Sequence, residues 1–397
     1  MSNARTMRLL MAGTGLLLMA GPTLALDGAD LLAKINAATG VPGNPVSAQS
    51  VDVSGTTVTL RGATYKPVPS EEAMSLGDVT LEGVQEESDG GYYIERVSFP
   101  DVNVREDKTT VSVSDIRMRD VYVPADVTGN TLDSVLLYEE ASAGPTTVSV
   151  DGKTVFSLAS SRSTTDVAED NSSVGFEVEV EGIKADLSTI EDAKSRDAVQ
   201  SLGLTSLDGS MTMSGSWQAE QGLVDVENYT IDLTDVGTLS LALSFSGYTL
   251  DFIKAAQQTS EALQENAGKE AQDAANLAML GLMQRLTFNS AEISFDDAGI
   301  TNRALDYAGK EQGVSGSTMA QMLKGMTPLV LAQYNIPKLQ TMVSEAVNTY
   351  LDDPGNFTIS AAPENPVPFP IIMGAAMGAP NTLPDVLGMT VEANQRQ

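Results

Sequence analysis

The chain of 397 residues contains no cysteine and no histidine. Without histidine, hydrolases that depend on a histidine base are excluded in their usual forms, as are histidine-bound zinc, copper and non-haem iron. Without cysteine there is no disulfide, thiol redox centre or iron–sulfur cluster, so packing alone must stabilise the fold. We therefore predict no cofactor, no metal site and no catalytic residue.

Motifs of other enzyme classes are missing as well. No lysine stands three positions after a serine, and the segment 313–317 (GVSGS) departs from the nucleophile-elbow pattern at its last residue. Carboxylate chemistry survives, because a glycoside hydrolase needs only two acids at a fixed distance. Sugar sites usually offer aromatic rings, however, and aromatics make up 5% of the chain, with one tryptophan. We interpret Trp217 as a rim residue at a sheet end, and Asp296 and Asp297 as turn residues.

Basic residues are also scarce. The chain has 23 Lys and Arg against 53 Asp and Glu, a formal net charge of −30. Such a charge repels nucleic acid and anionic surfaces, so no nucleic-acid partner is expected. Because the acids are dispersed, we interpret them as a means of solubility in a salty medium. The alternative is a surface for calcium or for a basic partner.

Long hydrophobic runs are absent beyond the N-terminus. Residues 1–25 have the pattern of a secretion signal, with Arg5 and Arg8 before an apolar run over 9–21 and small residues at a cleavage site after Ala25. An uncleaved membrane anchor is the alternative, but the run is shorter than the ~20 residues that span a bilayer. We predict cleavage, export to the periplasm of a Gram-negative bacterium, and no transmembrane span afterwards.

What the sequence does contain is alternation. In the stretch 237–246, Leu239, Leu241, Leu243 and Phe245 point one way while serine and alanine point the other. The same period of two recurs from 51 to 187 and from 206 to 246, which predicts strands with one apolar and one polar face. Because no helix-length segment separates most of these strands, we expect them to pair antiparallel in meander order. Short helices are predicted over 31–38 and 190–203.

The pattern changes to helical spacing over 251–286 and 317–351. We therefore predict a β-dominated α+β fold, with extended twisted antiparallel sheets and helices concentrated in the C-terminal half that pack on the sheet. The expected divisions are 1–25 (signal peptide), 26–200 (short helix and first β region) and 201–397 (second meander with the helices). The apolar faces should be covered partly by an opposite sheet and partly by helices.

Methionines are frequent in the helical segments. Thioether side chains adapt to irregular apolar partners, so these residues could line a hydrophobic groove between the helices and the sheet; the alternative is that they only fill gaps in the core. The groove candidates are Met279, Met283, Met319, Met322, Met326 and Met342.

Three segments resemble a group of exported, functionally uncharacterised proteins of alphaproteobacteria. They are 201–247 (beginning SLGLTSLDGSMTMSGSWQ), 293–315 (ISFDDAGITNRALDYAGKEQGVS) and 356–374 (NFTISAAPENPVPFPIIMG). In style the chain is also similar to AsmA-like envelope proteins, although it lacks their transmembrane anchor. The resemblance implies an envelope location and a non-enzymatic role, and it transfers no functional residue.

The predicted function is therefore a non-enzymatic periplasmic envelope protein that binds a lipid-like hydrophobic ligand or a protein partner. Two alternatives stay open. One is a carboxylate-dependent hydrolase of envelope glycan, and the other is a structural or assembly factor without a ligand.

Overall fold

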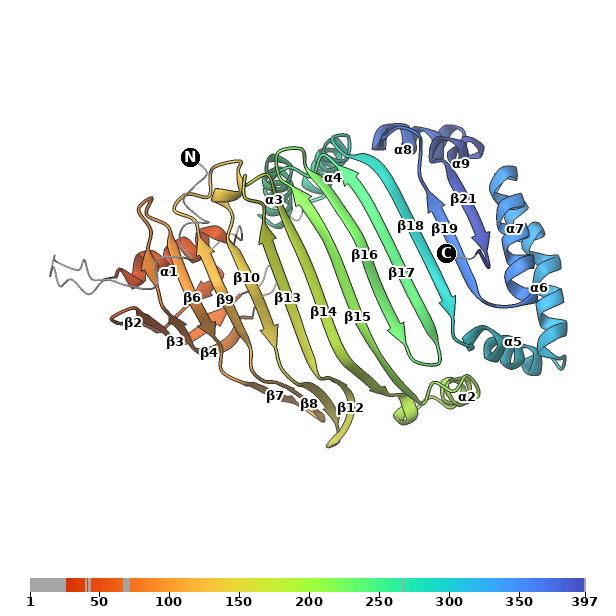
Figure 1. Cartoon of the computed structure of the whole chain (residues 1–397), viewed down its shortest axis with the longest axis horizontal. Helices are drawn as coiled ribbons and strands as arrows, with labels where there is room; N and C mark the ends of the chain where they lie inside the picture. The colour runs from red at the N-terminus through yellow and green to blue at the C-terminus, as the bar shows by residue number, and fades with distance from the viewer. Residues whose placement is uncertain (1–25, 40, 42–43, 67–71, 266–267, 396–397) are drawn as a thin grey trace.

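The computed structural model describes residues 26–39, 41, 44–66, 72–265 and 268–395. The predicted signal peptide, 1–25, lies outside these residues. Within them the chain is 42% strand and 32% helix. All twenty-one strands of the described part belong to one antiparallel sheet, which is not closed. The predicted β-dominated fold in meander order, with helices in the C-terminal half, is confirmed (Figure 1).

The first part of the sheet follows helix α1 (Gly28–Ala38). Its strands are β1 (Val46–Ser47), β2 (Ser50–Ser54), β3 (Thr57–Tyr65), β4 (Met74–Glu82), β5 (Gln85–Glu86), β6 (Tyr92–Ser98), β7 (Val102–Glu106), β8 (Thr109–Val113), β9 (Arg117–Val123), β10 (Leu137–Ala143), β11 (Thr146–Val150), β12 (Lys153–Leu158), β13 (Ser160–Val167) and β14 (Ser173–Asp186). The β7–β8 and β11–β12 hairpins extend the sheet at the lower edge in Figure 1.

The second part of the sheet carries most of the helices. Its strands are β15 (Ser206–Gln218), β16 (Leu223–Leu233), β17 (Gly237–Ser246), β18 (Thr287–Asp297), β19 (Asn356–Ala361), β20 (Val367–Pro368) and β21 (Met389–Ala393). The helices are α2 (Ala193–Ser201), α3 (Leu250–Glu265), α4 (Lys269–Met283), α5 (Ile300–Glu311), α6 (Gly316–Leu331), α7 (Pro337–Asp352), α8 (Phe369–Gly378) and α9 (Leu383–Val386). None of the helices in the described part is both long and apolar enough to cross a membrane.

The expected division near residue 200 falls between two strands that pair along their whole length. β14 and β15 pair from Ser173 opposite Gln218 to Asp186 opposite Ser206. Helix α2 lies in the connection between them, and Gly203 follows it with a positive φ of 67°. The sheet therefore continues across this position.

Residues paired directly across antiparallel strands point to the same side of a sheet. One continuous row of such pairs crosses the sheet from β2 to β21 and defines the apolar face. It consists of Val53, Val58, Leu81, Val97, Met118, Ala141, Ser163, Val178, Met213, Tyr229, Leu241, Ile293, Ile359 and Val391.

A neighbouring row crosses the same strands and defines the polar face. It consists of Asp52, Thr59, Thr80, Ser98, Arg117, Ser142, Arg162, Glu179, Thr212, Thr230, Ser240, Ser294, Thr358 and Glu392. Because the side-chain period of a strand is two, a one-residue shift in any strand would exchange the two faces. The contrast between the rows therefore fixes the register of the sheet.

Helix α1 covers the apolar face at its N-terminal end. Leu31 is fully buried there with Val58, Leu81 and Val97, and strands β3, β4, β6 and β9 form the largest buried cluster. The Asp27 side chain caps the helix by accepting the backbone N–H groups of residues 29 and 30 at 3.0 Å. This end of the molecule has the packed core that the alternating pattern predicts.

Helix α7 covers the apolar face at the other end. Ala346 is buried against Val391 and Ala393 of β21, and Phe357 and Ile359 of β19 pack on the same cluster. The expectation that an opposite sheet would also cover this face is wrong, because all strands of the described part lie in one sheet. In the described part, helices and the loops next to them cover this face, and each helix reaches a limited number of strands.

Candidate functional site

The central strands leave their apolar face open to solvent. Leu239 and Leu241 of β17 are each 37% exposed, and Ile293 of β18 is 41% exposed, whereas Leu81 in the same row is 2% exposed. We call Leu239, Leu241 and Ile293 the open patch. These three residues adjoin one another, since Leu241 is paired with Ile293 and Leu239 is two positions along β17.

On the opposite side of the same strands, the small polar residues are better covered than these large apolar ones. Ser294 is only 6% exposed although its neighbour in the chain, Ile293, is largely open. Ser240, between the two leucines, lies 3.3 Å from the hydroxyl of Thr230. Packing usually buries isoleucine before serine, and β18 shows the reverse order at these two positions.

Two further apolar rows flank the Leu241 row on the same face, and apart from Leu239 their large side chains are half-buried. Above and below the Leu241 row, the paired residues are Val180, Met211, Ile231, Leu239, Phe295 and Phe357 in one row, and Phe176, Gly215, Val226, Leu243, Ala291 and Ala361 in the other. Gly215 is required in its row because a Cβ there would lie 2.7 Å from the ring of Phe176 and 2.3 Å from a backbone oxygen. Within these three rows from β14 to β18, Tyr229 carries the only polar side-chain group.

Helix α3 borders the open patch at one end of the strands. Its residues Leu250 and Ile253 pack with Val174 and Trp217, and the indole N–H of Trp217 donates to the Tyr248 carbonyl oxygen at 2.9 Å. The predicted rim position of Trp217 is thus where the structure places it. Lys254 anchors the helix further by donating to the carbonyl oxygens of residues 128 and 129 at 2.9 and 2.7 Å.

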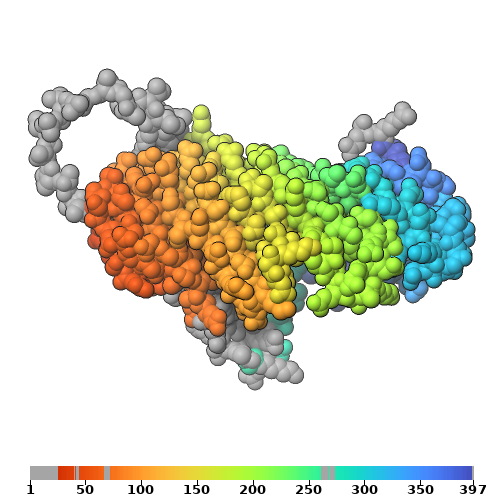
Figure 2. Space-filling view, turned by 90° about the horizontal axis from the view of Figure 1, so that it is seen from below, coloured from red at the N-terminus to blue at the C-terminus, as the bar shows by residue number. Residues whose placement is uncertain are grey.

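Helices α3 and α4 form a hairpin inserted between β17 and β18, the two strands that carry the open patch. Helix α4 is itself apolar and open, with Leu277 70% and Leu280 46% exposed. Figure 2 shows part of this hairpin, in teal, projecting from one side of the band of strands. Exposed apolar surface therefore continues from the sheet onto the connection between its two central strands.

The six methionines proposed for a groove lie on three helices. Met279 and Met283 belong to α4, with Met279 43% exposed. The three methionines of α6 differ in exposure. Met319 is buried against Leu305 of α5, whereas Met322 and Met326 are exposed. Met342 of α7 packs on the β19 and β21 cluster. Met319 and Met342 thus lie in two different buried clusters. The leucines and isoleucine of the open patch were not predicted as site residues, although their alternation was the signal that could have identified them.

Acidic side chains show little convergence for catalysis or metal binding. Among the residues that the structure describes, no three acids converge to hold a metal ion. Burial, followed by the charge of nearby Asp120, raises the pKa of Glu139. The predicted turn residue Asp297 accepts the backbone N–H groups of Gly299 and Thr301 at 2.7 and 2.8 Å, which fixes the entry to helix α5.

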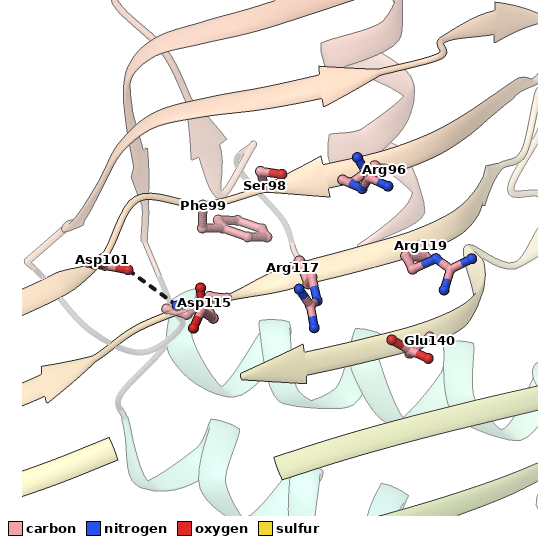
Figure 3. A pocket seen from close by; sticks show the side chains of 9 residues that line it. Arg96, Ser98, Phe99, Asp101, Asp115, Arg117, Arg119 and Glu140 are labelled. Atoms are coloured by element: carbon pink, nitrogen blue, oxygen red, sulfur yellow. Dashed lines mark hydrogen bonds between the residues drawn. The ribbon is translucent and has the colours of Figure 1, made fainter. Parts of the chain in front are cut away.

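A cavity of about 500 Å³ lies on the polar face, between β6, β9 and β10. Arg96, Arg117 and Arg119 line it together with Asp115 and Glu140 (Figure 3). Its charged lining contrasts with the open patch on the other side of the sheet. The molecule therefore presents two distinct surfaces, one apolar and one charged.

The fold and these surfaces define an open, single-sheet protein whose two faces differ in polarity. In the described part, its apolar face is covered by α1 and α7 at the two ends of the sheet and by α3 beside Val174 and Trp217. A family model described as "Uncharacterized protein" matches residues 230–394, from within β16 to the end of β21. The match includes β17, β18 and the α3–α4 hairpin between them. A search of curated proteins finds no match.

Proposed function

We propose that this protein is a non-enzymatic binding protein that holds a lipid-like hydrocarbon chain on the open part of its apolar face. The observation that carries the proposal is the exposure of Leu239, Leu241 and Ile293 in paired strands whose opposite face buries serine. Covering such side chains is favourable by about 25 cal/mol per Å² of apolar surface.

The form of the surface supports a linear ligand. The Leu241 row runs across β14 to β18, and four inter-strand spacings of about 4.8 Å make it about 19 Å long. A hydrocarbon chain laid along it would gain about 0.8 kcal/mol for each CH₂ group removed from water. A continuous apolar row of this length suits an extended chain.

The lack of polar groups on this strip favours a lipid over a protein partner. The backbone N–H and C=O groups of the central strands are used in the sheet ladder, since β16 to β18 pair on both sides. Protein interfaces typically carry about ten direct hydrogen bonds, and in these rows the Tyr229 hydroxyl is the one side-chain group that could contribute. Recognition here depends on apolar contact and shape.

The location proposed with this function is the periplasm, where an exported protein meets envelope lipids. The support is the signal-like pattern of residues 1–25. Because the protein carries a strong negative charge, it would repel a ligand with a neutral or zwitterionic headgroup less than an anionic ligand.

The experiment is native mass spectrometry and lipid extraction on protein purified without detergent from its own periplasm. We expect a bound lipid in the wild-type protein, and its loss in Leu241→Lys and in Ile293→Lys, because a charge in the strip opposes hydrocarbon. Thr212→Lys is the matched control, since it places the same charge on an exposed position of the polar face. An apo wild-type protein, or equal lipid in all three variants, would contradict the proposal.

A further inference from the structure

The cavity on the polar face brings three arginines together in a chain that has few basic residues. Arg96 of β6 is paired directly with Arg119 of β9, and Arg117 is paired with Ser98 two positions along the same strands. These four side chains therefore share one face and form a compact block. Figure 3 shows the three guanidinium groups at one end of the cavity and Asp101 and Asp115 at the other, with Phe99 between them.

The pairing of Arg96 with Arg119 is unfavourable by itself, because like charges directly opposite in a sheet repel. The chain has 53 acidic residues from which an opposite charge could have been supplied. Elsewhere on the same face an arginine is paired with acids: Arg61 contacts both Asp52 and Asp78, at 3.0 and 2.8 Å. In the arginine block, Arg96 has Glu82 opposite it on β4 and Arg119 has Glu140 opposite it on β10. Arg117 lies instead between Ser98 and Ser142, with no acid directly opposite.

Nearby acids neutralise the block only in part. Arg96 contacts Glu82 at 3.3 Å, but Arg119 reaches no closer than 4.0 Å to Asp120. Glu140 lines the cavity, yet its carboxylate accepts two hydrogen bonds from Arg162, at 3.1 and 2.8 Å.

Arg117 is the least neutralised of the three. Its Nε donates to the Ser142 hydroxyl at 3.1 Å. Within the described residues, no carboxylate lies at ion-pair distance from its guanidinium group. Arg117 and Arg119, two positions apart on one strand, therefore keep guanidinium N–H groups available toward the cavity.

We infer that Arg96, Arg117 and Arg119 form a binding site for a phosphate-type oxyanion. Guanidinium groups bind phosphate oxygens through paired, charge-assisted hydrogen bonds. An oxyanion between Arg117 and Arg119 would supply the negative charge that Arg117 lacks, and the Ser98 hydroxyl adds a further donor at the same place. The cavity volume, about 500 Å³, is within the range of small-molecule sites. The site lies on the other face from the open patch, so it does not depend on the proposed lipid binding.

The experiment is titration of the full mature protein with inorganic phosphate at low ionic strength, followed by calorimetry and by ³¹P line width. We expect saturable binding that weakens at least about tenfold in the double variant Arg117→Gln/Arg119→Gln, because each lost charge-assisted hydrogen bond corresponds to about a factor of ten. The control is Arg61→Gln, which removes one arginine from the same face and should bind phosphate like the wild type. No binding by the wild type, or equal binding by the double variant with an unchanged circular dichroism spectrum, overturns the inference.

A second arm identifies the source of the oxyanion. Flotation with phosphatidylcholine vesicles, with and without phosphatidic acid, tests for a lipid phosphate. Recruitment that requires phosphatidic acid and both arginines assigns the site to a lipid headgroup. Phosphate binding without such recruitment assigns it to a soluble phosphorylated compound.

Discussion

Two leucines on the apolar face allow a direct test of how this face is covered. Leu81 is 2% exposed in the α1 cluster, and Leu241 is 37% exposed in the open patch. Leu81→Ala should cost about 2–5 kcal/mol, because it removes buried carbons and leaves a cavity. For Leu241→Ala no cavity forms. At ~0.8 kcal/mol per buried CH₂, losing three carbons from a side chain about two-thirds covered costs about 1.5 kcal/mol.

The assay is urea unfolding of ligand-free protein, followed by far-ultraviolet circular dichroism and by Trp217 fluorescence, with the free energy of unfolding obtained by linear extrapolation. We expect Leu81→Ala to lose clearly more stability than Leu241→Ala, with similar m-values. Equal losses at protein concentrations that keep the chain monomeric would refute the reasoning, because Leu241 would then have to be packed as tightly as Leu81.

Four other substitutions test particular positions. A Lys153 amine 2.7 Å away is the main cause that lowers the pKa of Asp186 to about 2. Because that pKa lies below the usual 3.8, the ion pair stabilises the folded protein above pH 3.8, and this stabilisation is lost toward pH 2. Asp186→Asn should therefore have a lower urea midpoint than the wild type at pH 6. The two midpoints should converge between about pH 4 and 2. Asn36→Ala should cost about 1–3 kcal/mol in urea unfolding, because the buried amide exchanges two hydrogen bonds of 2.8 Å with the backbone of β1. Gly247→Ala should lower the melting temperature, since φ is +94° and a Cβ would lie 2.1 Å from a carbonyl oxygen; Gly325→Ala in α6 has no atom within 4 Å and should raise it slightly.

Strands were predictable here because each one carries its own pattern. Alternation over 239–246 predicted both β17 and the side that its leucines share. The turn between β11 and β12 also has a local cause, because its Asp-Gly pair, Asp151 and Gly152, adopts positive φ. Helix α5 was not predicted. It begins after Gly299 in a left-handed conformation, and the capping contact comes from Asp297 across the turn, which in sequence is indistinguishable from an ordinary turn aspartate.

The site was less predictable than the fold. The methionine content predicted a groove along the helices. Met319 and Met342, however, pack into separate clusters, and the exposed apolar residues of the central strands are leucine and isoleucine. The arginine block was also missed, because Arg96 and Arg119 are distant in sequence and meet only through the β6–β9 pairing.

The sequence by itself determined the chemistry that is excluded, the strands, and the residues that share each face, because these depend on side-chain type and on a period of two. Only the tertiary structure decided which part of the apolar face is covered. Coverage depends on where helices far away in the chain come to lie: α1 and α7 reach the two ends of the sheet, and no pattern within β17 or β18 distinguishes a leucine that will be packed from one that faces solvent.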